Sequence, residues 1–440
     1  MKAVQESASA PTARSPILTT SLKLPCGAVL LNRLVKAAMT EGLADARNNV
    51  TNELLTLYRL WASNGLGLML TGNVQIDRAH LERPGNIVVD DQTDMEALKR
   101  LAVVGTEHGN QFWAQLNHTG RQTPASVNPR PYAPSGISLP VAEAVCGEAR
   151  EMPESEIKRV ISLFASSARL CQAAGFTGVQ IHGAHGYLIS QFLSPLANKR
   201  EDQWGGSLEN RARLLIETVR AVRAAVGADF PVSVKLNSAD FQRGGFDEGE
   251  SARVVGWLND EAVDLLEISG GNYEQMEMVG IGSDGPRAAA ASTVAREAYF
   301  LDYARHIRPL FSNPLMITGG MRSAAAINAA LAAKECDLIG IGRPLCIDPQ
   351  SAGQLIQGEI DRMPALDTKL AMRSDALGPD VEPATFKRIE SFALLGWYCV
   401  QLLRVGRGQG ADVGMDVFDA LLAYKANEER AAAEWSGASR

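Results

Sequence analysis

Short apolar runs recur along the chain, and each is ended by Gly, Ser, Thr, His or Asn. Most of these runs are followed by a helix-like stretch. Apolar runs of about four to six residues between turn formers are typical of strands that are buried on both faces, as in a parallel sheet. The pattern predicts eight strands, over Arg33–Ala38, Leu66–Thr71, Gln111–Leu116, Gly178–Ile181, Pro231–Leu236, Val263–Ile268, Pro314–Thr318 and Asp337–Ile341.

The segments between these runs predict helices. Several of them open with a residue that caps a helix well, namely Thr51, Ser207 and Asp247. The predicted helices cover Asn52–Asn64, Glu154–Ala174, Ser207–Val226, Glu248–Glu261, Ala291–Ile307 and Ala324–Ala333.

Eight alternating β/α units between Arg33 and about Pro364 predict an α/β fold of the (β/α)8 TIM barrel type. A doubly wound sheet is the competing fold. It would need a GxGxxG fingerprint after its first strand, where this sequence instead has AAMTEGLAD. The order of elements therefore favours the barrel.

The barrel is expected to occupy residues 17–366, with the segment Thr20–Leu31 forming a hairpin over its amino-terminal mouth. Residues 1–16 are polar and lack the apolar stretch of a signal peptide, so we expect a disordered leader. Residues 367–440 are expected to form a helical C-terminal extension, with helices over Thr385–Val405 and Asp416–Trp435 that dock by their apolar positions.

Composition and charge limit the kinds of binding partner and the cellular compartment that we expect for this protein. The 440 residues carry a net charge of −7 with no basic run, which argues against nucleic acid or an anionic membrane surface as a partner. The longest weakly polar stretch, Ser391–Leu403, is too short to cross a bilayer. Six cysteines without a CxxC pair supply neither a metal ligand set nor a disulfide framework. We expect a soluble, cytoplasmic protein without a bound metal.

The strongest chemical signal follows the fourth predicted strand. Two of the six histidines, His182 and His185, stand there beside Tyr187. In a parallel α/β barrel, reacting groups collect at the carboxyl ends of the strands. Histidine and tyrosine can each donate a hydrogen bond to a substrate oxygen, and tyrosine can also deliver a proton. This cluster predicts a catalytic site.

Other strand ends indicate a phosphorylated cofactor. Gly319-Gly320 and Gly342-Arg343 follow the seventh and eighth strands, where barrels often bind phosphate through exposed amides and an arginine. Gln115 and Lys235 add an amide and a cation, and no acidic cluster points to magnesium. Flavin mononucleotide (FMN) fits this set, because Gln115 could pair with the pyrimidine edge and Lys235 could stabilise the charge gained on reduction.

The stretch HGAHGYLISQFLSPLANKREDQWGGSLENR resembles the signature of the old yellow enzyme family of FMN-dependent ene-reductases. NRLVKAAMT, FWAQLNHTGR, VSVKLNSADF and GIGRPL match at the first, third, fifth and eighth strands, and the resemblance covers roughly Leu24–Pro364. It implies an oxidoreductase that takes hydride from NADH or NADPH onto tightly bound FMN. Hydride then passes from flavin N5, in a ping-pong reaction, to an activated alkene such as an enone, enal, maleimide or nitroalkene.

The resemblance also implies roles for individual residues. His182 and His185 would bind the activating oxygen of the substrate, Tyr187 would donate the proton, and His182 would also line the flavin. The cofactor would be held by a set of residues from six strand ends: Ala38, Met39, Thr40, Gly72, Gln115, Lys235, Gly319, Gly320, Gly342 and Arg343. Two of these depart from the family pattern, since Ala38 replaces a common proline and Lys235 a common arginine.

Several questions stay open at the level of sequence. A lone lysine in a barrel mouth could make Lys235 the nucleophile of a Schiff-base lyase. A flavin-binding protein that has lost turnover is another alternative. His118 and Arg121 suit loop structure and ligand contact equally well, whereas Arg200 and Arg211 are expected to brace the long loop after the fourth strand. The chain could also pair with copies of itself.

Overall fold

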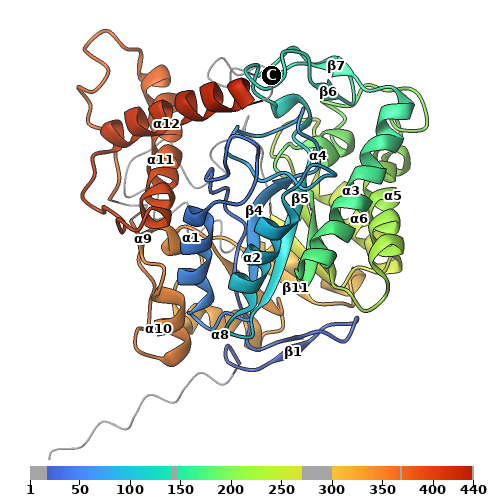
Figure 1. The fold of residues 1–440 in the computed structure, drawn as a ribbon. Helices are drawn as coiled ribbons and strands as arrows, with labels where there is room; N and C mark the ends of the chain where they lie inside the picture. Colours follow the sequence, from blue (N-terminus) through green and yellow to red (C-terminus); the bar gives the residue numbers. More distant parts are fainter. Residues whose placement is uncertain (1–16, 140–145, 270–299, 367–368, 439–440) are drawn as a thin grey trace, which may run out of the picture.

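The computed structural model describes residues 17–139, 146–269, 300–366 and 369–438. Eight parallel strands close into a barrel, as the sequence predicts (Figure 1). Around the barrel they are β3 (Leu34–Lys36), β4 (Leu68–Gln75), β5 (Gln111–Asn117), β8 (Gly178–Gly183), β9 (Val232–Asn237), β10 (Leu265–Ser269), β11 (Leu315–Thr318) and β12 (Leu338–Ile341), which pairs with β3.

All eight predicted strands are confirmed, but β4 runs four residues beyond its predicted end. The register between β4 and β5 shifts between Leu70 and Asn73, and pairing then resumes as far as Gln75 and Asn117. A bulge of this kind re-aims the side chains that follow it. The irregularity carries Asn73 into the barrel mouth, where it becomes part of the site described below.

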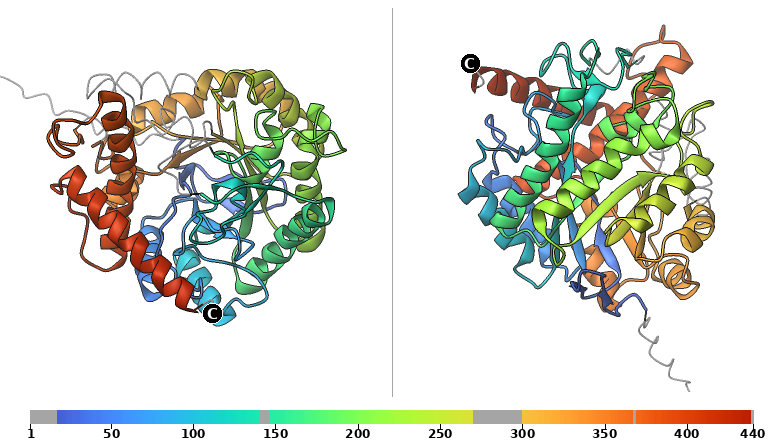
Figure 2. Two further views of the ribbon diagram at one scale, coloured as in Figure 1. Left: turned by 90° about the horizontal axis from the view of Figure 1, so that it is seen from above. Right: turned by 90° about the vertical axis from the view of Figure 1, so that its right-hand side faces the viewer.

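Helices surround the strands, as the view from above shows (Figure 2). The predicted helices correspond to α1 (Asn52–Ala62), α3 (Glu154–Ala174), α5 (Leu208–Val226), α6 (Glu248–Asp260) and α8 (Ala324–Ala332). The predicted caps are confirmed, because Thr51, Ser207 and Asp247 each accept a backbone N–H from the first turn of their helix. Of the predicted helix Ala291–Ile307, residues 300–307 are helical and the rest lies outside the described residues.

Further helices were not predicted. They are α2 (Met95–Thr106) between β4 and β5, α4 (Leu188–Leu193) after β8, and α9 (Pro344–Ile347) and α10 (Ser351–Gln357) after β12. Short 3-10 turns lie at Gly120–Gln122 and Arg308–Leu310, and β6 (Tyr132–Ala133) pairs with β7 (Arg150–Glu151) in the loop after β5.

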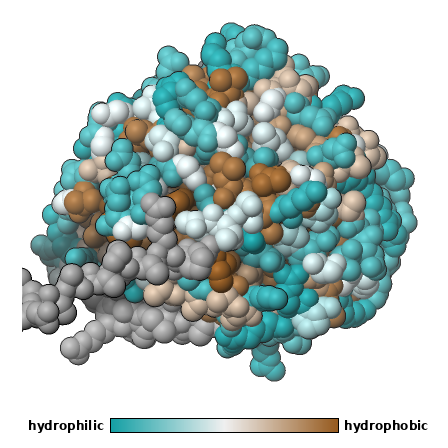
Figure 3. Space-filling view, turned by 90° about the horizontal axis from the view of Figure 1, so that it is seen from below, coloured by the Kyte–Doolittle hydropathy of each residue, from teal (hydrophilic) through white to brown (hydrophobic). Residues whose placement is uncertain are grey.

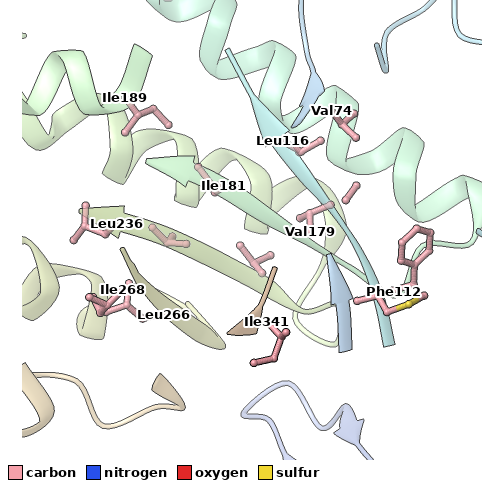
Figure 4. Packing of buried hydrophobic residues seen from close by; sticks show 14 of the residues in the cluster. Val74, Phe112, Leu116, Val179, Ile181, Ile189, Leu236, Leu266, Ile268 and Ile341 are labelled. Atoms are coloured by element: carbon pink, nitrogen blue, oxygen red, sulfur yellow. The ribbon is translucent and has the colours of Figure 1, made fainter. Parts of the chain in front are cut away.

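The main hydrophobic core lies between the barrel and its helices (Figure 4). Leu116, Ile181 and Leu236, from three neighbouring strands, are fully buried there. Burial of branched apolar side chains on the outer face of a parallel barrel leaves the inner face for a separate set of residues. That inner set is apolar at the bottom of the barrel and polar toward its mouth.

The predicted hairpin closes the bottom of the barrel. Strands β1 (Leu22–Lys23) and β2 (Val29–Leu30) pair antiparallel. Leu24 and Leu30 pack against the inward-facing side chains Val35, Leu68, Leu70, Trp113, Leu265, Met316 and Leu338. On this lower face, hydrophobic residues form separate spots between polar ones (Figure 3). The predicted leader, residues 1–16, lies outside the described residues.

The C-terminal extension contains the two predicted helices, as α11 (Pro383–Gly406) and α12 (Val417–Ala438). They pack against each other beside α1 (Figures 1 and 2). The indole N–H of Trp435 donates to Asn48 Oδ1 at 3.0 Å, which joins the end of α12 to the loop after β3. The prediction that this segment docks is therefore confirmed. Within the described residues, no helix combines the length and apolarity needed to cross a bilayer.

Candidate active site

The structure brings His182, His185 and Tyr187 together at the end of β8. The ring centroids of His182 and His185 are 5.0 Å apart, and those of His182 and Tyr187 are 4.9 Å apart, both edge to face. The left-handed backbone of His185, with φ of 61°, turns the chain sharply between strand and helix. Tyr187 then directly precedes α4. Such strained conformations are common where side chains are placed for function.

Both histidines are held neutral. Burial lowers the pKa of His182 well below its ordinary value, and the nearby His185 and Lys235 act in the same direction. Burial and Lys235 likewise lower the pKa of His185. The amide of Ala184 donates to His182 Nδ1 at 3.2 Å, so the ring proton of His182 lies on Nε2. His182 therefore offers a neutral N–H donor, which suits a substrate oxygen.

A polar layer lines the inner wall of the barrel below these rings. Strand register pairs His182 with Lys235, and Lys235 with Glu267, on three neighbouring strands. Lys235 Nζ lies 3.0 Å from Glu267 Oε1, with both side chains buried. Gln180 donates to Glu267 Oε2 at 2.9 Å, and Gln115 donates to Gln180 Oε1 at 2.7 Å. The predicted residues Gln115 and Lys235 are thus joined through Gln180 and Glu267 by two hydrogen bonds and one ion pair.

Tyr187 is also joined to a second cluster, which comes from the irregular part of β4 and from the loops after β3 and β4. Asn73 Nδ2 donates to the Tyr187 hydroxyl oxygen at 3.1 Å and to Glu82 Oε2 at 2.9 Å. The predicted residue Thr40 donates its hydroxyl to the same Glu82 oxygen at 2.8 Å. Thr40 and Tyr187 are 147 positions apart in sequence, yet only Glu82 and Asn73 separate them in the structure.

The predicted phosphate residues lie at the ends of β11 and β12. Gly319 and Gly320 have φ of 128° and 77°, a region that L side chains rarely adopt. Arg343 directly precedes α9, and its guanidinium lies 5.9 Å from the ring centroid of Tyr398 on α11. Adjacent glycines in this conformation and a nearby arginine suit a phosphate, and the polar layer of Gln115 and Lys235 suits a flavin ring.

The ends of β3 and β4 approach closely near Gly72. A β-carbon at Gly72 would lie 2.4 Å from the Met39 carbonyl oxygen and 2.3 Å from Glu41 Oε2, so only glycine fits. The Gly72 amide donates to Glu41 Oε1 at 2.9 Å. Gly72 therefore shapes the mouth through close packing, with its N–H already bonded within the protein. Met39 contacts Cys346 through its sulfur, at 3.4 Å, and Ala38 packs against the inner apolar cluster.

His118, which the sequence left undecided, lies in a largely buried group with Asp77 and His80. Their ligand atoms lie within 4.8 Å of one another, close enough to suggest a metal site. However, His118 Nδ1 accepts the Gly120 amide and His80 Nε2 accepts the Tyr132 amide. The rings thus carry their protons on His80 Nδ1, 2.9 Å from Asp77 Oδ2, and on His118 Nε2, which lies 3.8 Å from the same oxygen and has no hydrogen-bond partner within the described residues. A metal-bound histidine instead carries its proton on the nitrogen remote from the metal.

The charges of this group also favour hydrogen bonding within the protein. Burial opposes ionisation of Asp77, but the hydrogen bond from His80 and the nearby His118 hold the pKa of that carboxyl below its usual range. Arg159 adds an ion pair at 2.7 Å. We conclude that Asp77, His80 and His118 brace the loops after β4 and β5.

The expected bracing of the loop after β8 is confirmed. Arg200 Nη2 lies 2.6 Å from Asp202 Oδ2, and its Nη1 donates to the Met152 carbonyl at 2.7 Å. Arg211 pairs with Glu250 on α6. Buried arginines that satisfy several acceptors at once fix loop geometry more firmly than exposed pairs do.

Several site residues were given no role from the sequence: Asn73, Glu82, Gln180, Ser269 and Glu267. A charged residue inside the apolar run LLEIS could have revealed Glu267, because an inward-facing carboxylate needs a buried partner. Ser269, whose hydroxyl lies 2.7 Å from His185 Nε2, follows directly on that strand. The sequence around Asn73 and Glu82 showed no comparable pattern, because a bulge in β4 and the loop after it bring these two residues to the site.

Comparisons with known proteins agree with this geometry. The model of the NADH:flavin oxidoreductase / NADH oxidase family matches residues 24–361. The NADH-dependent flavin oxidoreductase iliE of Hypocrea jecorina is 37% identical over 349 residues, which cover 74% of this chain and 86% of that protein. Its namesake from Neonectria sp. is 38% identical over 348 residues, and there the matched part covers 74% of this chain and 45% of the relative.

A solved structure shows the same architecture. The old yellow enzyme homologue from Zymomonas mobilis superposes with a TM-score of 0.66 at 25% sequence identity. The superposition covers 80% of this chain and 96% of that structure. The resemblance noted in the sequence is thus confirmed at the level of family and fold.

Proposed function

Because the chain belongs to the NADH:flavin oxidoreductase / NADH oxidase family, and so is an FMN-dependent oxidoreductase of the old yellow enzyme type, we propose that it reduces activated C=C bonds. The substrates would be enones, enals, maleimides or nitroalkenes, and the hydride donor NADH or NADPH. The observation that carries the proposal is the contact of His182, His185 and Tyr187 at one strand end.

FMN, when bound, would supply the redox chemistry, by accepting hydride from the nicotinamide and passing it to the β-carbon of the alkene. The protein side of the reaction follows from the residues described. Neutral His182 and His185 would donate hydrogen bonds to the carbonyl or nitro oxygen and so stabilise the negative charge that develops there. Tyr187 would then give its hydroxyl proton to the α-carbon and regain one from water.

The surrounding residues would bind and orient the reactants. Gly319, Gly320 and Arg343 would hold the cofactor phosphate, and Gln115 and Lys235 its pyrimidine edge. Glu267 supports this role for Lys235, since the buried ion pair fixes the position of the Lys235 side chain. A fixed flavin orients one reactant at a time, and such orientation supplies a large part of an enzymatic rate.

The same ion pair argues against the Schiff-base alternative. A lysine nucleophile must lose its proton to attack a carbonyl group. Lys235 Nζ instead lies 3.0 Å from the buried carboxylate of Glu267, an ion-pair contact in which the amine is not free to attack. Borohydride added with a carbonyl substrate is therefore expected to trap no adduct on Lys235.

A direct test is steady-state oxidation of NADH and NADPH by the purified, FMN-loaded protein. We expect the rate of nicotinamide oxidation under nitrogen to rise when cyclohexenone or maleimide is added, with the saturated product formed in equal amount. A protein that retains FMN but shows no alkene-dependent oxidation would be a flavin-binding protein without this turnover. A protein that retains no FMN after reconstitution would overturn the proposal as a whole.

A further inference from the structure

The C-terminal extension contacts the loop after β4 through one arginine. Arg83 Nε donates to Glu428 Oε2 on α12 at 3.0 Å, and Arg83 Nη2 pairs with the other oxygen of the same carboxylate. The guanidinium also lies 5.1 Å from the ring centroid of Tyr424, one turn earlier on α12. A bidentate ion pair together with a nearby aromatic ring fixes both the position and the orientation of the Arg83 guanidinium. The Arg83 side chain is only 5% exposed.

The residue next to Arg83 faces the candidate active site. Glu82 Oε2 accepts hydrogen bonds from Thr40 and Asn73, and Asn73 in turn donates to Tyr187. The backbone amides of Glu82 and Arg83 both donate to Asn86 Oδ1, each at 2.9 Å. The turn is therefore held at its backbone, so a displacement of Arg83 would also displace Glu82.

The chemistry of Glu82 determines what its two neighbours offer. A carboxylate accepts hydrogen bonds and donates none, so Asn73 must turn its NH2 group, not its carbonyl oxygen, toward Glu82 and Tyr187. An amide N–H on the Tyr187 oxygen stabilises the phenolate left after proton donation. Because the Tyr187 oxygen is the acceptor in this bond, the phenolic hydrogen is not used in it. Thr40, with its hydrogen directed to Glu82, presents acceptor lone pairs to any ligand.

We propose that Glu82 is a positioning residue that sets the hydrogen bonding of Thr40 and Tyr187, and that the C-terminal extension sets the place of Glu82 by gripping Arg83. The extension lies beyond residue 361, where the family match ends. It would thus be a part of the active-site architecture that this chain adds to the family barrel. The inference rests on the proposed function, because it assigns Tyr187 the role of proton donor.

The first experiment tests whether Glu82 acts through Tyr187. Enzyme reduced in advance is mixed rapidly with cyclohexenone, and the rate of flavin reoxidation is measured under nitrogen. We expect Glu82→Ala to slow this step about 10- to 100-fold, the range for a lost hydrogen bond to a charged group. Glu82→Gln keeps an acceptor oxygen and should recover most of the rate. In a Tyr187→Phe background, Glu82→Ala should slow the step less than about threefold, because residues that act as one unit are not additive.

Two results would overturn the claim that Glu82 acts through Tyr187. One is that Glu82→Ala retains the wild-type rate. The other is that it slows the Tyr187→Phe enzyme by the same factor as the wild type, which would mean that Glu82 acts independently of the phenol. If Glu82→Ala does not fold, the same cycle is run with Glu82→Leu, which also removes the acceptor oxygen but keeps more of the side-chain volume.

The second experiment tests the extension. Glu428→Gln removes the charge that grips Arg83, and Glu434→Gln is its matched control on the same helix, where the exposed pair with Arg430 is 4.0 Å long. We expect Glu428→Gln to slow flavin reoxidation by alkene about 3- to 10-fold with FMN content unchanged, and to add nothing in the Glu82→Ala background. Glu434→Gln should match the wild type. Equal rates for Glu428→Gln and Glu434→Gln would refute the coupling.

These outcomes separate the inference from the proposed function. If the wild-type protein binds FMN but does not reduce alkenes, the proposed function fails. If the wild type reduces alkenes and Tyr187→Phe slows it, while the Glu82 and Glu428 variants do not, only the inference fails.

Discussion

The polar layer inside the barrel and the loop cluster above it reach the same mouth by different means. In the layer, strand register pairs Gln115 with Gln180 and Lys235 with Glu267. The hydrogen bond from Gln180 to Glu267 then joins the two pairs. In the cluster, Thr40, Asn73 and Glu82 come from a loop, a bulge and a second loop. The layer is fixed once the barrel closes, whereas the cluster also depends on what packs against its loops.

This difference suggests a division of labour. A layer built on strands is rigid, and rigid elements hold reacting groups more precisely than loops do. A cluster built on loops is easier to vary without disturbing the fold. Contacts to the flavin ring would then belong to the layer, and the handling of the substrate and its proton to the groups above it. The predictions below test this division.

The largest effect is expected from replacing His182 and His185 together by Ala. Each lost donor to a developing oxyanion slows a reaction about 10²- to 10³-fold, so the pair should slow alkene reduction by about 10⁴-fold or more. Reduction of the flavin by NADH or NADPH should be affected far less, and the protein should stay yellow. Rapid mixing of each half-reaction separately measures both effects.

Arg343→Ala is expected to show the opposite behaviour to the double histidine variant, with loss of cofactor binding and not of alkene reduction by the FMN-loaded protein. It should lose FMN on dialysis, and excess FMN should restore much of its activity. If the double histidine variant purifies without flavin while Arg343→Ala keeps it, the assignment of roles around the barrel mouth is wrong.

Tyr187→Phe comes next, because it removes a hydroxyl that also links the site to the loop cluster. Loss of a general acid typically slows a step about 10²- to 10⁴-fold. We expect this loss for alkene reoxidation of the flavin, with FMN content and reduction by nicotinamide unchanged. An unaltered reoxidation rate would show that water or another residue supplies the proton.

Glu267→Gln tests the rigidity of the inner layer. The substitution leaves Lys235 buried without its carboxylate, which should lower the free energy of unfolding by about 3–5 kcal/mol. Glu209→Gln on α5 removes an exposed partner of Arg253 and should lower the free energy of unfolding far less. Urea unfolding of both variants measures the difference, and similar losses would mean that Lys235 finds another partner.

The smallest effect concerns acid stability. Burial lowers the pKa values of His118, His182 and His185 in the folded protein, so below about pH 6.5 the unfolded chain binds more protons than the folded one. The stability that these neutral rings contribute is present above about pH 6.5 and is lost as the pH falls toward their folded pKa values. Each ring should contribute up to about 1.4 kcal/mol per pH unit in that window.

Urea unfolding at a series of pH values between 8 and 5 measures this slope. His182→Asn should make the slope shallower, whereas His108→Asn, at an exposed position, should leave it unchanged. A slope that is the same in all three proteins would mean that the buried rings do not govern acid stability.

The sequence predicted the barrel well because its strands and caps are local features. Eight apolar runs and the caps Thr51, Ser207 and Asp247 need no distant contact to be recognised. The grouping of His182, His185 and Tyr187 was equally visible, since one short segment carries all three. By contrast, a bulge brings Asn73 to Tyr187, and Arg83 meets Glu428 across 345 positions. No local pattern encodes contacts of this kind.

The contacts of α12 also bear on the order in which the molecule is completed during synthesis. Asn48 meets Trp435 across 387 positions, and Arg83 meets Glu428 across 345. Of the described elements, α12 leaves the ribosome last, after every strand of the barrel has emerged. The loops after β3 and β4 therefore lack their contacts with α12 until synthesis is nearly finished. A ribosome that stalled before α12 would leave a nascent chain with all its strands and an unfinished mouth. Chaperones and proteases that recognise exposed hydrophobic surface would then bind the loops and helix faces that α12 normally covers, although the barrel strands themselves would already be paired.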